Sequence, residues 1–408
     1  MAISEKLLRA LPKSDLHVHL DGSLRLGSLI EMAEERGVVL PSSTAEGLRE
    51  LVFKERYDSL VEYLEGFRYT TAVLRDAEGL ERAAYELMCD NIAEGVRYIE
   101  VRFAPQLHMG ESLDMRDVCL AVNRGLKRAT DEHNRSGPVQ NGLEPPFRYG
   151  MIVCAMRMFT EEMSPYFQQI HRVHRESPRD YVGGLASLEL ARAAVRIRDE
   201  YGLPIVGFDL AGQENGYPAI DHIEAYRYAH EHFMKKTVHA GEAYGPESIF
   251  QAITALHADR IGHGYHLFSP WLIEPTRVSD RGTYVRELAE YIADRRITIE
   301  VCITSNLQTN PNIRLPGNHV MHEMLNRRLS VTLCTDNRLV SNTTMTNELK
   351  LATDTFHLDA EMLKDIIIYG FKRSFFPGSY LDKRTYVRQV IDYYETVARG
   401  FTEEAGEA

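Results

Sequence analysis

The sequence predicts a (β/α)8 barrel, a fold of the mixed α/β class, from three observations. Eight short apolar or β-branched runs follow one another along the 408 residues. Between them lie segments in which apolar residues recur at three- and four-residue spacing, which is typical of helices. The runs themselves are continuous rather than alternating, as expected of strands buried on both faces of a parallel sheet. Eight such repeats favour closure into a TIM barrel over an open sheet.

These patterns place the expected elements along the chain. The strands are expected at residues 14–20, 96–104, 149–155, 205–210, 236–239, 260–263, 297–301 and 330–335. Helices are expected between them, among others at residues 78–94, 188–201, 219–235 and 285–295. Because barrels with insertions run past about 400 residues, the chain 1–408 is expected to form one domain. Residues 337–408 are expected to add helices at the C-terminus.

The connection between the first two strands is long enough for extra helices. It spans residues 21–95, where Leu60, Val61, Leu64 and Phe67 recur at helical spacing. Because it leaves the carboxyl end of a strand, where barrel enzymes keep their active sites, we expect it to form a lid or pocket wall. The alternative is a helical pair that only faces solvent.

Composition and charge exclude several classes of partner. The net charge of −12 would repel nucleic acid, whose binding depends on clustered Lys and Arg. No stretch approaches the roughly 20 apolar residues that span a bilayer, and the first residues lack the apolar core of a secretory signal. Five widely spaced cysteines without a CxxC pair indicate reduced thiols and a cytoplasmic protein. The sequence does not indicate an oligomeric state.

Candidate metal ligands lie at the ends of three expected strands, whereas the strand interiors read as apolar. His17 and His19 are two residues apart on an extended segment, so both imidazoles point to the same side. His239 ends the fifth strand and Asp336 ends the eighth. For each of these residues taken alone, an ordinary structural role is a stronger explanation than metal binding. Together, on strand ends that converge in a barrel, they predict a metal site that suits zinc, although iron, manganese and cobalt accept the same ligand types.

Other candidate residues surround that site. Glu242 follows His239 by three residues, and Gly241 allows the backbone to turn there. His263 ends the sixth strand between two glycines, which is consistent with a tight turn that directs the ring into the barrel mouth.

Two more candidates could contact a ligand directly. Gly212 follows the fourth strand, where a small residue would let a planar ligand approach the backbone; the alternative is a plain turn glycine. Asp21 could accept hydrogen bonds from ligand hydroxyls or merely cap the following helix.

Three other pairs of closely spaced histidines lie in polar helical or loop stretches instead of strand ends. Short His spacings arise readily, so surface positions are expected for all of them. The pairs are His171 and His174, His230 and His232, and His319 and His322.

At the strand-end residues the chain closely resembles the adenosine deaminase family of the amidohydrolase superfamily. The matching segments run in order along nearly the whole chain: KSDLHVHLDGSL, YLEGFRYTTAVL, EVRFAPQLH, CAMR, GFDLAGQE, VHAGE, RIGHGYH, SNLQT and TDN. An ordered series of this kind is highly specific.

The resemblance implies a role for each site residue. The ligands of one zinc ion per chain would be His17, His19, His239 and Asp336. The catalytic residues would be Glu242 as acid/base at the purine, His263, which would steer the attacking water, and Asp336. Asp336 and His263 could also relay the proton of that water toward the departing ammonia. The substrate, a small-molecule purine nucleoside, would contact His19, Asp21, Gly212 and Asn337.

The implied reaction is the hydrolytic deamination of adenosine, and of deoxyadenosine, to inosine and ammonia. Zinc lowers the pKa of its bound water to about 7, which supplies a nucleophile for C6 of the purine. Protonation of ring N1 by Glu242 makes C6 more electrophilic, a general acid effect worth about 10²- to 10⁴-fold. Glu242 must therefore arrive protonated.

Asn337 departs from the family pattern, because many members carry a second aspartate there that meets purine N7. The amide NH2 of Asn337 could serve N7 at any pH, and its oxygen could turn toward the exocyclic amine. The substitution leaves open a different 6-aminopurine substrate, such as adenine or a 5′-modified nucleoside of the 6-aminodeoxyfutalosine kind.

The same residues argue against several rival functions. A nucleotide substrate would need cations for its phosphate, and Asp21 opposes a dianion although Lys13 and Arg25 are near the first strand. Deaminases with HxE and PCxxC zinc motifs use another fold, and neither motif occurs here. A metal-dependent ester or lactone hydrolase would not require Glu242. A catalytically silent nucleoside-binding protein should have lost a ligand or Glu242, and none is missing.

Overall fold

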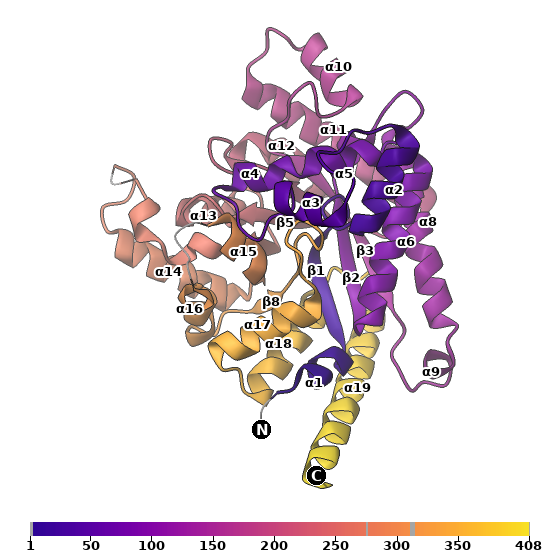
Figure 1. The fold of residues 1–408 in the computed structure, drawn as a ribbon. Coiled ribbons are helices and arrows are strands. Elements are labelled where there is room, and N and C mark those ends of the chain that lie inside the picture. Colours follow the sequence, from indigo (N-terminus) through magenta and orange to yellow (C-terminus); the bar gives the residue numbers. More distant parts are fainter. Residues whose placement is uncertain (1–2, 275, 311–314, 408) are drawn as a thin grey trace.

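The computed structural model describes residues 3–274, 276–310 and 315–407. Eight strands pair in parallel in their sequence order, which confirms the predicted (β/α)8 barrel (Figure 1). The barrel closes where Val18 bridges Asp336, and the His19 amide donates to the Asp336 carbonyl at 2.7 Å. The strands are β1 (Lys13–His19), β2 (Val96–Phe103), β3 (Arg148–Met156), β4 (Ile205–Ala211), β5 (Lys235–Ala240), β6 (Arg260–His263), β7 (Thr298–Val301) and β8 (Val331–Leu333). All eight runs expected from the sequence are strands, with ends that differ by at most two residues.

Helices fill the connections between consecutive strands from β2 onward. Side chains cap the first turns of α8, α10 and α14, and at the start of α8 Asp114 and Asp117 form a reciprocal capping box. These helices are α7 (Pro105–His108), α8 (Met115–Asn134), α9 (Gly137–Gln140), α10 (Pro165–Val173), α11 (Arg179–Tyr201), η1 (Ala219–His222), α12 (Ile223–Glu231), α13 (Pro246–Thr254), η2 (Tyr265–Phe268), η3 (Pro270–Leu272), α14 (Arg281–Arg295), α15 (Ile303–Thr309), η4 (Pro316–Asn318) and α16 (Met321–Asn326).

The long first connection is helical, as predicted. It contains α2 (Leu26–Arg36), α3 (Ala45–Leu51), α4 (Leu60–Glu65), α5 (Phe67–Val73) and α6 (Ala77–Ala93). Figure 1 shows α3, α4 and α5 over one end of the strands, with both chain termini at the other end. Because α1 (Glu5–Ala10) enters β1 from the terminal side, the covered end is the one where the strands finish.

Helices also follow the last strand, namely α17 (Met345–Phe356), α18 (Ala360–Arg373) and α19 (Tyr380–Glu407). Helix α18 packs on β1 and β8 and so covers the seam at which the barrel closes. Along the described ranges, no helix combines the length and the apolar composition needed to cross a membrane. Cys154, Cys302 and Cys334 lie in apolar runs and are buried.

Candidate active site

The four predicted metal ligands lie together at the carboxyl ends of the strands. His17 and His19 come from β1, His239 comes from β5, and Asp336 follows β8; one ligand atom of each lies within 4.8 Å of the others. Nε2 of His19 is 3.1 Å from Nε2 of His239 and 3.5 Å from Oδ1 of Asp336. Three nitrogens and one oxygen at this spacing can hold a single metal ion.

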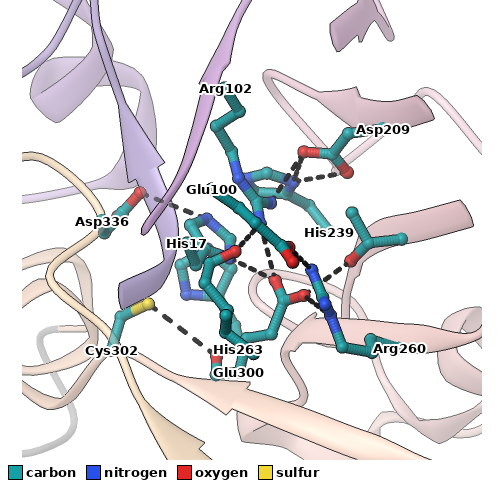
Figure 2. A network of polar contacts seen from close by, with 12 residues as sticks. His17, Glu100, Arg102, Asp209, His239, Arg260, His263, Glu300, Cys302 and Asp336 are labelled. Carbon is teal, nitrogen blue, oxygen red and sulfur yellow. Dashed lines mark hydrogen bonds and ion pairs between the residues drawn. The ribbon is translucent and has the colours of Figure 1, made fainter. Parts of the chain in front are cut away.

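Buried carboxylates orient two of the imidazoles from behind (Figure 2). Nδ1 of His17 lies 2.8 Å from Glu300, and Nδ1 of His239 lies 3.2 Å from Asp209. Because an ionised carboxylate only accepts, each Nδ1 carries the hydrogen, and each Nε2 keeps its lone pair toward the centre. No described residue donates a hydrogen bond to Nε2 of the fully buried His17. These unused lone pairs fit a bound cation.

The prediction that the strand interiors are apolar was wrong. Arg102 in β2 is fully buried and donates to Asp209 at 2.8 Å and to Glu300 at 2.9 Å. Arg260 in β6 binds Glu300 at 2.6 Å and also pairs with Glu100. Burial of these charges is tolerated because each one is paired and hydrogen-bonded. The Arg102 guanidinium therefore ties together the two carboxylates that orient His17 and His239.

Glu242 lies beside the ligand cluster on the loop after β5. Gly241 has φ +71°, which turns the chain there, and the Glu242 side chain is only 6% exposed. Burial raises the pKa of Glu242 well above its ordinary value, and the charges of Asp336 and Glu214 raise it further. Both effects favour the protonated form of this carboxyl group.

Glu214 holds the loop that carries Glu242, and sequence reasoning missed it. Its carboxylate accepts the backbone N–H groups of Gly241, Glu242, Ala243 and Tyr244 at 2.7 to 3.0 Å, and also the Ser248 hydroxyl. Burial raises the pKa of Glu214, but Arg157 and the hydrogen bonds outweigh burial and bring it below its ordinary value. Glu214 ends the GFDLAGQE segment, and this match to the family pattern was the sequence feature that could have identified it.

His263 and Asp336 occupy strained backbone at the strand ends. Their φ angles are +62° and +61°, a region that side-chain-bearing residues rarely adopt. Nε2 of His263 lies 3.7 Å from Oε1 of Glu242, and the His263 ring is 4.9 Å from the ring of His17. The predicted catalytic residues are thus assembled within one cluster.

A cavity of about 590 Å³ opens onto this cluster. Its walls include Asp21, Gly212 and Asn337, together with residues of α4 and α5, which belong to the segment expected to form a lid or pocket wall. Gly212 has φ +96°, which favours glycine. One carboxylate oxygen of Asp21 has no hydrogen-bond partner among the described residues, while the other lies 3.6 Å from His108, a buried residue that sequence reasoning missed.

The Asn337 amide is held by the lid. Its Nδ2 donates to the hydroxyl of Tyr63 in α4 at 2.8 Å, and that hydroxyl lies 2.7 Å from Ser341. Oδ1 of Asn337 has no partner in the described structure and packs against Gly22, where an added Cβ would lie 1.8 Å away. One amide hydrogen is therefore already used, and the second is free to meet a ligand acceptor.

The prediction of a surface position for His319 was wrong. This residue is 2% exposed, and its Nε2 lies 3.2 Å from Oδ1 of Asn306 behind the site. His322, three residues later, is exposed as expected. The local pattern around His319 is polar, but Asn306, Tyr265 and Phe356 pack against its ring in the folded chain.

Comparisons with known proteins find relatives along nearly the whole chain. Residues 12–393 match the family model described as adenosine deaminase. Adenosine deaminase 1 of Streptomyces coelicolor is 35% identical over 381 residues, which cover 91% of this chain and 84% of that protein. The adenosine deaminase of Mycobacterium marinum is 34% identical over 370 residues, covering 90% and 91% respectively.

Among solved structures, a COG1816 amidohydrolase of Burkhoderia ambifaria with bound Zn shares the fold, with a TM-score of 0.73 at 20% identity. The match covers 99% of the present chain and 96% of the Burkholderia chain. The family model spans every strand and every candidate ligand, and two relatives above 30% identity match along almost the whole chain. The chain therefore belongs to the adenosine deaminase family.

Proposed function

We propose that this chain is a zinc-dependent adenosine deaminase, which converts adenosine and deoxyadenosine to inosine or deoxyinosine and ammonia. The observation that carries the proposal is a buried carboxyl group, Glu242, which lies in the same cavity as four convergent metal ligands and whose raised pKa favours the protonated form. The relatives named above are adenosine deaminases by name. The five free cysteines fit the reducing cytoplasm.

The donor set favours zinc, one ion per chain. His17, His19, His239 and Asp336 would hold it, since three imidazole nitrogens and one carboxylate oxygen suit its usual fourfold coordination. When bound, zinc makes a water molecule acidic enough to serve as the nucleophile near neutral pH. Burial lowers the pKa of His19 well below its ordinary value and also lowers that of His239, which keeps both rings neutral and able to donate lone pairs.

Glu242 is proposed as the proton donor to purine N1. A protonated carboxyl group can give its hydrogen to a ring nitrogen, which draws electron density from C6 and prepares it for attack. As a carboxylate, the same group can then take up a proton and return it to the departing amine. Glu214 would keep Glu242 in register through the four backbone hydrogen bonds.

The nucleoside would be positioned by groups around the cavity. The unpaired oxygen of Asp21 is available for a sugar hydroxyl, and the backbone at Gly212 is open to the edge of the base. The free hydrogen of the Asn337 amide would donate to N7. Leu60 and Leu64 from α4 would cover the apolar faces of the ring and exclude water.

A 5′-modified nucleoside is the second candidate substrate. Arg68 and Arg75 from the lid region line the same cavity, and so do Glu65 and Glu162. These side chains can interact with a polar 5′ substituent, whereas a bare base such as adenine would leave them unused.

A spectrophotometric screen tests the proposal. Purified protein is assayed against adenosine, deoxyadenosine, adenine, AMP and 5′-modified nucleosides, and adenosine and deoxyadenosine are expected to give the highest kcat/KM. Glu242→Gln should abolish deamination, while Glu224→Gln, an exposed change of charge in α12 away from the cavity, serves as the control. Absence of turnover with every 6-aminopurine would refute the proposal, and ester hydrolysis that persists in Glu242→Gln would favour the rival hydrolase.

A further inference from the structure

A chain of three hydrogen bonds runs behind His263, away from the cavity. Nδ1 of His263 lies 3.2 Å from Nδ2 of Asn306 in α15. Oδ1 of Asn306 lies 3.2 Å from Nε2 of His319, which precedes α16. Nδ1 of His319 accepts the backbone N–H of Met321 at 3.1 Å. All three side chains are at most 2% exposed.

The backbone N–H at the far end sets the direction of the whole chain. A peptide N–H only donates, so Nδ1 of His319 must be the acceptor. In a neutral imidazole the other nitrogen then carries the hydrogen, and Nε2 of His319 donates to Oδ1 of Asn306. The Asn306 amide is thereby oriented with Nδ2 toward His263, where it donates to Nδ1. The hydrogen of the neutral His263 ring is left on Nε2, the nitrogen that faces the cavity.

The opposite orientation of the Asn306 amide conflicts with the same contacts. A flipped amide would point its NH2 group at the N–H of His319 and leave two donors facing each other. Only a deprotonated Nε2 on His319 would remove this conflict, and Nδ1 of His319 would then have to face the Met321 N–H with a hydrogen of its own. Burial lowers the pKa of His319 to about 3, so this ring is neutral at physiological pH.

We propose that Asn306 and His319 are positioning residues that lock His263 in the Nε2–H tautomer, so that this ring enters the active site as a hydrogen-bond donor. The consequence for catalysis rests on the proposed deaminase function. A ring nitrogen that carries a hydrogen cannot accept another one. His263 therefore orients the attacking oxygen and stabilises negative charge, and the proton released by the water goes to a carboxylate. Glu242 is available for that proton once it has given its own to N1.

The tautomer can be measured directly by NMR. In full-length, metal-loaded protein labelled with 15N-histidine, protonated and bare ring nitrogens have well-separated 15N shifts, and His263→Gln identifies the His263 signals by their loss. The expected result is a protonated Nε2 and a bare Nδ1 on His263. A protonated Nδ1 on His263 in the wild-type protein would overturn the proposal without any further variant.

Two substitutions at one position separate tautomer control from packing. His319→Phe keeps a ring but removes the donor to Asn306, so the Nδ1–H tautomer of His263 should appear and kcat should fall by about 10- to 100-fold, the usual cost of losing such a supporting partner. His319→Gln keeps an acceptor for Met321 and a donor for Asn306, and should restore both the tautomer and kcat. His322→Phe, on the exposed face of α16, is the matched control.

The outcomes distinguish this inference from the proposed function. An unchanged tautomer and an unchanged kcat in His319→Phe would overturn the proposed positioning role of Asn306 and His319. A wild-type protein with the expected tautomer but no deamination of adenosine would refute the proposed function, while the positioning role of Asn306 and His319 would be supported. Loss of kcat in His319→Phe with an unchanged tautomer would show that His319 only packs, which also overturns the inference.

Discussion

Replacement of Glu214 by glutamine tests how the acid of the site is held in place. The Glu214 carboxylate accepts three backbone N–H groups at Oε2 and one at Oε1, all from the loop that carries Glu242. Glutamine has a single acceptor oxygen on an uncharged group of the same shape. Glu214→Gln therefore changes the number and charge of acceptors without changing the volume.

The cost can be worked out from these contacts. In the better orientation the amide oxygen keeps the three N–H groups at the Oε2 position, and its NH2 group faces the N–H of Gly241, which lies 2.8 Å from Oε1 in the wild type. An unmet buried donor costs about 1–3 kcal/mol, and each of the three remaining bonds loses about 1 kcal/mol with the charge. The loop is thus destabilised locally by about 4–6 kcal/mol. A displacement of Glu242 by about 1 Å would lower kcat by about 10²-fold.

Steady-state deamination of adenosine, together with metal content and thermal unfolding, measures this effect. We expect kcat to fall by about 10²-fold while the metal is retained, because none of the four ligands is on the displaced loop segment that starts at Gly241. Glu224→Gln, an exposed change of charge in α12, is the matched control. A kcat within about twofold of wild type in folded Glu214→Gln would refute the reasoning, since Glu242 would then be positioned without Glu214.

Three further predictions follow from single residues. His239→Ala should abolish metal retention and turnover together in metal analysis and kinetics, and full activity in metal-free mutant protein would contradict the ligand assignment. Gly22→Ala places a Cβ 1.8 Å from Oδ1 of Asn337, so we expect loss of one substrate hydrogen bond and about a tenfold lower kcat/KM; Gly27→Ala, with nothing within 4 Å of its added Cβ, is the control, and equal kinetics in the two variants would contradict this. Burial raises the pKa of Glu348 from 4.5 to about 7, so between these two pH values the folded state binds a proton that the unfolded state releases. The contribution of this group to the free energy of unfolding, about 3 kcal/mol, is complete below pH 4.5 and is lost as the pH rises through 7. Denaturant unfolding between pH 4.5 and 8 should show a smaller decrease in Glu348→Gln than in wild type, and identical pH profiles would contradict the assignment.

The arrangement of the ligands could be predicted because it depends on local geometry and on topology alone. The two-residue spacing of His17 and His19 on a strand places both rings on one side, whatever surrounds them. His239 and Asp336 end their strands, and parallel strands of a barrel finish at a common rim. The barrel closes at Asp336 itself, where Val18 bridges it. The backbone contact that closes the sheet therefore also brings Asp336 beside the two histidines of β1.

The supporting residues could not be predicted in the same way, because their partners are distant in the sequence. Arg102 looks unfavourable inside a strand until Asp209 and Glu300, 107 and 198 residues away, are placed beside it. His319 lies in a polar stretch, and only the packing of Asn306 against it shows that it is buried and paired. Sequence patterns report whether a side chain is polar, but not which distant group compensates for its burial.

The charges of the buried network connect the fold to its metal. Four carboxylates, those of Glu100, Asp209, Glu300 and Asp336, and the two guanidinium groups of Arg102 and Arg260 lie in the buried cluster drawn in Figure 2. Buried charges are costly unless they are compensated, so the excess of carboxylates is best balanced by a divalent cation among the imidazoles of His17, His19 and His239. The same carboxylates direct the imidazole lone pairs to that point. Binding of the cation should then stabilise the whole barrel, and chelation should lower the Tm of the wild-type protein but not that of His239→Ala.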